Sequence, residues 1–295
     1  MDKLFRYAGF FLLVAVSIGL WWNPLKSSLS LASHSSEHTH ILLVLPLTFA
    51  FIYLRRKTLP AKFVASTGTA AVFLLVALAI AGATRSRSYE WTEDIRLSLN
   101  MLALVAWWLG SVVLCFGTRV LGALLFPLGL LLWLIPIPQP ALDSIIHFLQ
   151  HQSALAARIL FQAFGVPVTQ DGIMLSIPEV DLEVARECSS IRSSLILIIT
   201  AMVLASLFLR SRWRKILLVA AAVPLSVAKN GLRIFVIAEL GTRVDPTFFD
   251  GWLHHRGGIV FFATAVLALV GLLWILQRNE NVPAVSECTA RLADN

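Results

Sequence analysis

The strongest constraint on this chain is a series of apolar runs, each close to the length that crosses a lipid bilayer. The hydrocarbon core of a bilayer is about 30 Å thick, so a helical span needs about 20 predominantly apolar residues. About eight such runs are present, and the second and fifth are short for a membrane span. They cover residues 7–22, 40–54, 63–83, 98–116, 120–135, 191–209, 216–240 and 258–276. The sequence therefore predicts an all-α polytopic membrane protein.

The composition supports a membrane protein and argues against the soluble classes. Hydrophobic residues make up 58% of the chain and charged residues only 14%, whereas soluble domains carry about 25% charged residues. A cytosolic enzyme, a nucleic-acid-binding module and a disordered chain are excluded together. We therefore interpret the net charge of +7 as a signal of membrane orientation, with no nucleic-acid partner.

The distribution of basic residues predicts how the chain is oriented. If the N-terminus is cytoplasmic, the inner segments hold more than half of the 24 Lys and Arg residues. The two densest basic runs, residues 55–57 and 210–215, then fall in short inner loops. Because cytoplasmic loops are enriched in Lys and Arg, we expect both termini to lie in the cytoplasm.

The segment between the fifth and sixth runs is not a simple membrane crossing. Prolines at positions 136, 138 and 140 end the fifth run. Residues 141–164 carry polar groups at helical spacing, which predicts an amphipathic helix on the membrane surface. An Asp-Gly pair within residues 167–177 predicts a β-hairpin, and residues 182–184 form a third β-prone piece. We expect these elements to form a small extracytoplasmic collar that leads into the sixth helix.

A cysteine at the start of the sixth predicted helix is a candidate nucleophile. Cys188 lies on the outer side, and a helix N-terminus carries partial positive charge that favours a thiolate. Arg186 and Arg192 add to this field, whereas Glu187 opposes it. The alternative is a small residue without chemistry, which is the more common role of a lone cysteine.

The seventh predicted helix carries charges within its apolar run. Lys229 and Arg233 are four residues apart, and Asn230 is three residues before Arg233, so the three share one helical stripe. A charge at the bilayer centre costs at least about 2.5 kcal/mol, which makes these residues candidates for a functional site. The alternative is a structural cation that snorkels or pairs with Glu239.

Two histidines occur at the start of the eighth predicted helix. One interpretation is a pair at the membrane interface without function, and the other is a part of a reactive site. The predicted topology places His254 and His255 on the same side of the membrane as Cys188 and Arg233. A thiol, a guanidinium and an imidazole that converge would suit a nucleophile, an anion stabiliser and a base. The sequence thus favours a site with a cysteine nucleophile.

Metal or cofactor binding is not predicted. His34, His38 and His40 offer an i, i+4 histidine pair, but the flanking serines favour a solvated loop. The three cysteines are widely separated and form no zinc-binding spacing.

Three motifs occur in a fixed order within residues 136–262. They are Arg186-Glu187-Cys188-Ser189-Ser190-Ile191-Arg192-Ser193, then Pro224 with Asn230 and Arg233, then His254 with Gly258. Together they resemble the core of the exosortase/archaeosortase family of multi-pass membrane transpeptidases. The corresponding family motifs read Glu-Ala-Cys-Ser-Gly-Ile-Arg-Ser, Pro-x(5)-Asn-x-x-Arg and His-x-x-x-Gly. This chain departs from them at Ser190, where the family has Gly, and at Glu187, which directly precedes the cysteine.

The resemblance implies a mechanism and a class of substrate. Cys188 would attack a peptide carbonyl to form an acyl-thioester, Arg233 would stabilise the oxyanion or donate a proton, and His254 would assist, with His255 as the alternative. Arg192, Lys229 and Asn230 are predicted to contribute to substrate binding. The substrates would be exported proteins whose C-terminal signal holds a Pro-Glu-Pro motif, a transmembrane helix and a basic end. Family members commonly accompany exopolysaccharide synthesis, and no cofactor is implied.

The resemblance also implies a location and a division of the chain. The protein would lie in the bacterial inner membrane, in contact with the lipid bilayer, with its active site on the periplasmic side. Residues 1–135 would be N-terminal helices, 136–276 the catalytic core and 277–295 a cytoplasmic tail. The alternative class is a non-catalytic transporter or polysaccharide-assembly subunit in which Lys229 and Arg233 bind an anionic substrate. Transporters usually show inverted repeats and interrupted helices, and neither signal is evident in the sequence.

Overall fold

The computed structural model describes residues 3–60, 63–86, 90–178, 180–184, 191–248 and 258–278. The chain divides into two compact units, Met1–Leu142 and Asp143–Asn295, and each is described by itself. Within the described residues, six helices are long and apolar enough to cross a membrane, or up to eight if each of two bent helix pairs is one span. The prediction of a helical polytopic membrane protein with about eight spans is thereby confirmed.

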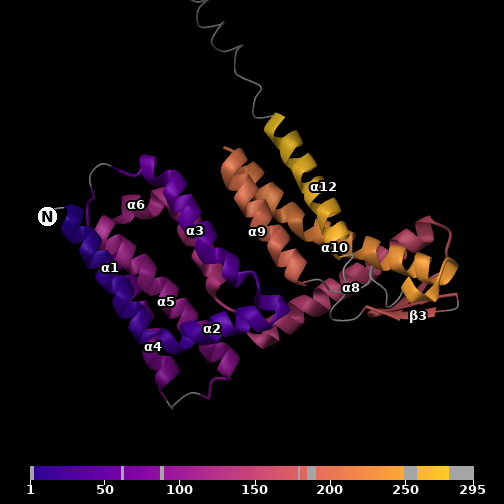
Figure 1. The fold of residues 1–295 in the computed structure, drawn as a ribbon, viewed down its shortest axis with the longest axis horizontal. Coiled ribbons are helices and arrows are strands. Elements are labelled where there is room, and N and C mark those ends of the chain that lie inside the picture. The colour runs from indigo at the N-terminus through magenta and orange to yellow at the C-terminus, as the bar shows by residue number, and fades with distance from the viewer. Residues whose placement is uncertain are drawn as a thin grey trace, which may run out of the picture. The chain divides into compact units, whose positions relative to one another are not determined.

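The first unit is a bundle built around one buried helix, α5 (Figure 1). Helix α5 (Glu93–Phe116) packs against α4 (Thr67–Arg85) and α1 (Lys3–Leu20). Met101, Ala103 and Leu104 of α5 are completely buried in the core of this bundle. The other elements are α2 (Trp22–His34), η1 (Ser36–His38), α3 (Ile41–Arg55), η2 (Arg56–Thr58), α6 (Thr118–Ala123), α7 (Leu125–Leu130) and η3 (Leu131–Leu134).

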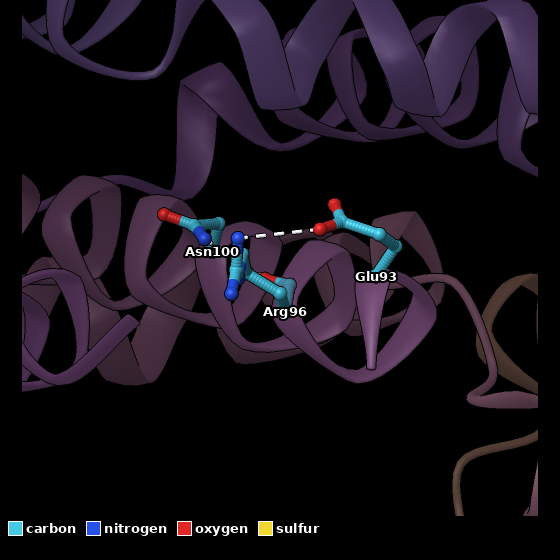
Figure 2. A network of polar contacts seen from close by, with 3 residues as sticks. All are labelled: Glu93, Arg96 and Asn100. Carbon is cyan, nitrogen blue, oxygen red and sulfur yellow. Dashed lines mark hydrogen bonds and ion pairs between the residues drawn. The ribbon is translucent and has the colours of Figure 1, made fainter. Parts of the chain in front are cut away.

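A polar contact near the start of α5 joins it to α4. Figure 2 shows Glu93, Arg96 and Asn100, which lie on successive turns of α5. Arg96 Nη1 pairs with Glu93 Oε1 at 3.2 Å, but both side chains are exposed, so this pair contributes at most about 1 kcal/mol. The buried Asn100 accepts a hydrogen bond from Thr84 of α4 at 3.3 Å. The ion pair lies within α5, so of these two contacts only the buried hydrogen bond joins α5 to α4.

Two predictions for the first unit are wrong in detail. The predicted span 120–135 is not one helix but the three short elements α6, α7 and η3. The break at Leu124 follows from Pro127, which has no N–H for the carbonyl of Ala123 and is tolerated only in the first turn of a new helix. After the predicted span 7–22, the chain bends by 75° and continues as a further helix, α2, which the apolar runs did not predict.

The expected solvated loop around the histidines is wrong for His38 and His40, whereas His34 is exposed. The exposed fractions of His38 and His40 are only 5% and 2%, and the His40 ring meets Trp133 edge-on with 6.0 Å between centroids. The two histidines are buried because the helices before and after them, α2 and α3, pack against each other. Among the described residues, no group of three or more His, Cys, Asp or Glu side chains is arranged to hold a metal ion.

The second unit contains the elements that carry the predicted site. Helices α9 (Ile191–Phe208), α10 (Arg212–Arg243) and α12 (Gly258–Arg278) pack side by side (Figure 1). Their shared core includes Leu197, Leu218 and Leu269, which are completely buried. The amphipathic helix predicted over 141–164 is α8 (Gln139–Ala163), most of which belongs to this unit. A short 3-10 helix, η5 (Pro246–Phe248), follows α10.

A small antiparallel sheet confirms the predicted hairpin and third strand. Strands β1 (Thr169–Asp171), β2 (Met174–Ile177) and β3 (Val180–Glu183) pair in sequence order. The turn between β1 and β2 begins at Gly172, whose φ of 60° is a conformation that glycine adopts readily. Leu175 of β2 is buried together with residues of α8 and α10, so the sheet packs on these two helices.

Candidate active site

Only part of the predicted site lies within the described residues. Arg192 is in the first turn of α9, and Lys229, Asn230 and Arg233 are in α10. Cys188, His254 and His255 lie outside the described residues. Cys188 is nevertheless placed in the sequence between β3 and α9, because Val184 follows β3 and α9 begins at Ile191.

Lys229 takes part in a buried polar layer between α9 and α10. Its exposed fraction is 6%, and its ammonium group donates a hydrogen bond to Ser193 Oγ of α9. The adjacent pair Ser194 and Ser226 also joins the two helices through their hydroxyl groups. Because Lys229 is buried and bonded to a neighbouring helix, it does not snorkel towards the membrane surface.

Asn230 faces α8. Its exposed fraction is 1%, and its amide nitrogen donates a hydrogen bond of 2.9 Å to Ser153 Oγ. Lys229 and Asn230 are consecutive residues, so they project in different directions from α10 and bind different helices. In the structure the Lys229 side chain therefore binds α9, and the Asn230 side chain binds α8.

Arg233 is half-buried one helical turn beyond Lys229. Glu239, which the sequence offered as its structural partner, forms an ion pair of 2.8 Å with Arg243. Lys229 and Arg233 thus place two positive charges one turn apart within a largely apolar helix. Such a pair would favour an anion or a developing oxyanion beside it. Arg192, by contrast, is exposed at the start of α9, and the residue that contacts Lys229 is its neighbour Ser193.

Helix α8 contributes contacts that sequence reasoning missed. Gln150 Nε2 donates a buried hydrogen bond of 2.7 Å to the carbonyl oxygen of Val184. Phe161 packs against Phe235 of α10, with ring centroids 5.1 Å apart. A signal for this packing was present, since α8 contains closely spaced alanines and serines and α10 contains Gly231, and small residues let helices approach closely.

Gly231 marks the closest approach of α10 to α8. A Cβ atom at this position would lie 2.5 Å from Cβ of Ala156 and 3.0 Å from the backbone of the same residue. We expect Gly231→Ala to destabilise the protein by about 1–3 kcal/mol, because the helices would have to separate. The measurement is the thermal unfolding midpoint of the purified protein in detergent.

A second glycine provides a matched control for this prediction. Gly271 lies in α12, and a Cβ atom there would meet nothing within 4 Å. Gly271→Ala should therefore be neutral or slightly stabilising, since alanine is the better helix former by about 1 kcal/mol. Equal midpoints for the two variants would show that the α8–α10 contact is looser than the structure indicates.

The fold and the residues of α8, α9 and α10 define a multi-pass membrane protein with a polar, positively charged region among its helices. The family model for transmembrane exosortase (Exosortase_EpsH) matches residues 21–271, so the chain belongs to the exosortase family. The match covers helices of both units and extends well beyond the residues 136–262 that carry the motifs. Comparison with curated proteins and with solved structures gave no match. Membership of this family makes the chain a transmembrane protein that processes sorting signals.

Proposed function

We propose that this protein is a cysteine transpeptidase that cleaves the C-terminal sorting signal of exported proteins through an acyl-thioester. The observation that carries the proposal is the family match over residues 21–271, within which all three motifs lie. The catalytic core would be residues 136–276, preceded by the N-terminal helices 1–135 and followed by the tail 277–295.

The reaction would use three side chains in sequence. The Cys188 thiol gives its proton to His254, or to His255, and the thiolate sulfur attacks the carbonyl carbon of the scissile peptide bond. Arg233 donates hydrogen bonds to the oxygen as it becomes negatively charged. The C–N bond then breaks, the leaving amine takes the proton from the imidazole, and a thioester remains on Cys188. An amine or a water molecule attacks this thioester and releases the processed protein.

The described contacts support a division of labour among the residues predicted to bind substrate. Arg192 is exposed at the start of α9, so it can meet an acidic group such as the Glu of a Pro-Glu-Pro motif. Lys229 and Asn230 already bond to Ser193 and Ser153, which favours roles in holding the helices that surround the substrate.

The test of this function is cleavage of a defined substrate. A tagged exported protein that ends in Pro-Glu-Pro, an apolar helix and a basic cluster is expressed with and without this chain. We expect a shortened product only when the chain is present and only when the Pro-Glu-Pro motif is intact. An uncleaved substrate, together with a change in secreted polysaccharide, would favour the non-catalytic assembly subunit.

The proposed orientation makes a separate prediction. The site should face the periplasm of a bacterial inner membrane, because positive-inside placement puts the loop between α9 and α10 in the cytoplasm. A reporter enzyme that is active only in the periplasm should therefore work when fused after residue 250 and fail when fused after residue 213. The reverse pattern would place the site on the cytoplasmic side and contradict an exported substrate.

A further inference from the structure

Helix α8 contacts both stretches of chain that carry the proposed reacting groups. Gln150 donates its hydrogen bond to the carbonyl of Val184, which stands four residues before Cys188. Ser153 accepts its hydrogen bond from Asn230, which stands three residues before Arg233. One helix therefore holds the approach to the nucleophile and the helix that bears the guanidinium.

The two contacts lie on one buried face of α8. Gln150 and Ser153 are three residues apart, so they project from the same side of the helix. Their exposed fractions are 9% and 1%, and those of Val184 and Asn230 are both 1%. A buried polar group that loses its partner is costly, so α8 cannot slide along α10 or away from Val184 without a penalty at each contact.

Apolar packing on the same face makes the attachment stiff. Ala157 and Phe161 of α8 are completely buried in one cluster with Val184 and with Phe235 of α10. Gly231 lets the backbone of α10 approach Ala156 so closely that no larger residue fits. Close-packed interiors transmit displacement, so a shift of α8 would move Val184 relative to α10.

We propose that Gln150 and Ser153 are positioning residues, which through α8 fix Val184, four residues before Cys188 in the sequence, relative to the helix that bears Arg233. The inference rests on the proposed function, because it takes Cys188 and Arg233 as reacting groups. Neither Gln150 nor Ser153 touches the substrate in this scheme. A displacement of about 1 Å at a distance from the chemistry can lower a rate about 100-fold, so positioning of this kind is a sizeable part of catalysis.

The first test compares two glutamines of α8 in the full-length protein in lipid vesicles. Gln150→Met keeps the length of the side chain but removes the donor to Val184, and Gln162→Met is the matched control because Gln162 is exposed on the same helix. We expect Gln150→Met to lower kcat for signal cleavage about tenfold to a hundredfold, with KM changed less than about twofold. Gln162→Met should match the wild-type protein in both.

A second readout requires no substrate. In a background where Cys115 and Cys288 are alanine, the alkylation rate of Cys188 by N-ethylmaleimide reports the surroundings of the thiol. We expect this rate to change several-fold in Gln150→Met and not in Gln162→Met. Ser153→Ala should show the same changes, and its control is His151→Ala, because His151 is exposed on the same helix. Ser153→Ala replaces Gln150→Met in both tests if Gln150→Met does not accumulate.

The outcomes separate this inference from the proposed function. If the wild-type protein cleaves no signal, the proposed function fails, and the alkylation rates alone decide whether the contacts of α8 affect the Cys188 thiol. If both kcat and the alkylation rate of Gln150→Met and Ser153→Ala equal those of their controls, the inference is overturned. A purely structural role would lower abundance while leaving kcat per folded molecule unchanged, and that result would also overturn it.

Discussion

Replacement of Cys188 by alanine is expected to abolish cleavage of the sorting signal while the protein remains in the membrane at its normal level. Removal of a catalytic nucleophile lowers rates by up to about 10⁶-fold in hydrolases, because no other group can form the covalent intermediate. Loss of the protein itself is not expected, since Cys to Ala is a small change in the segment between β3 and α9. The measurement is an immunoblot of a tagged substrate beside an immunoblot of the variant.

The other two cysteines provide the controls for this experiment. Cys115 is buried within α5, in the first unit, and Cys288 lies near the C-terminus, outside the described residues. Cys115→Ala and Cys288→Ala should both process the substrate normally, because neither belongs to a motif. Retained cleavage in Cys188→Ala would rule out the thioester mechanism, whatever the controls show.

Much of the fold could be predicted from the sequence because its signals are strong and local. Long apolar runs anticipated α3, α4, α5, α9, α10 and α12, and the Asp-Gly pair anticipated the turn between β1 and β2. The failures came where local rules compete. Pro127 divides a run that is apolar enough to be one helix, and α2 forms in a serine-rich segment that a hydropathy argument assigns to a loop.

The candidate site could be predicted only as a set of residue types. Spacing placed Lys229, Asn230 and Arg233 on one stripe of α10, and the structure shows that the first two bind different neighbouring helices. The partners Ser193 and Ser153 could not be foreseen, since a hydrogen bond between distant segments depends on how the helices pack. The hydrogen bond of Gln150 could not be foreseen either, because its acceptor is a backbone carbonyl, which no residue type in the sequence reveals.

Arg233 offers the sharpest separation of an enzyme from a membrane protein that needs only a positive charge. If Arg233 merely neutralises or attracts an anion, lysine should replace it with little loss. If it presents a planar group of donors to a carbonyl that becomes an oxyanion, lysine supplies a point charge in the wrong place. Loss of one oxyanion donor costs about 2.7–4 kcal/mol in well-studied hydrolases, which corresponds to about 10²–10³ in rate.

We therefore expect Arg233→Lys to yield membrane-inserted protein whose rate of signal cleavage is at least about a hundredfold lower. The matched control is Arg243→Lys, ten residues further along α10. The exposed side chain of Arg243 forms an ion pair with Glu239 that lysine can preserve. Both rates are measured from the time course of substrate cleavage, normalised to the abundance of each variant. Near-normal cleavage by Arg233→Lys would assign Arg233 a charge-only role, and disappearance of this variant alone would assign it a structural one. If the cleavage rate of Arg233→Lys falls a hundredfold at normal abundance while that of Arg243→Lys is unchanged, the result supports oxyanion stabilisation. Of the three roles, only this one depends on the planar shape of the guanidinium.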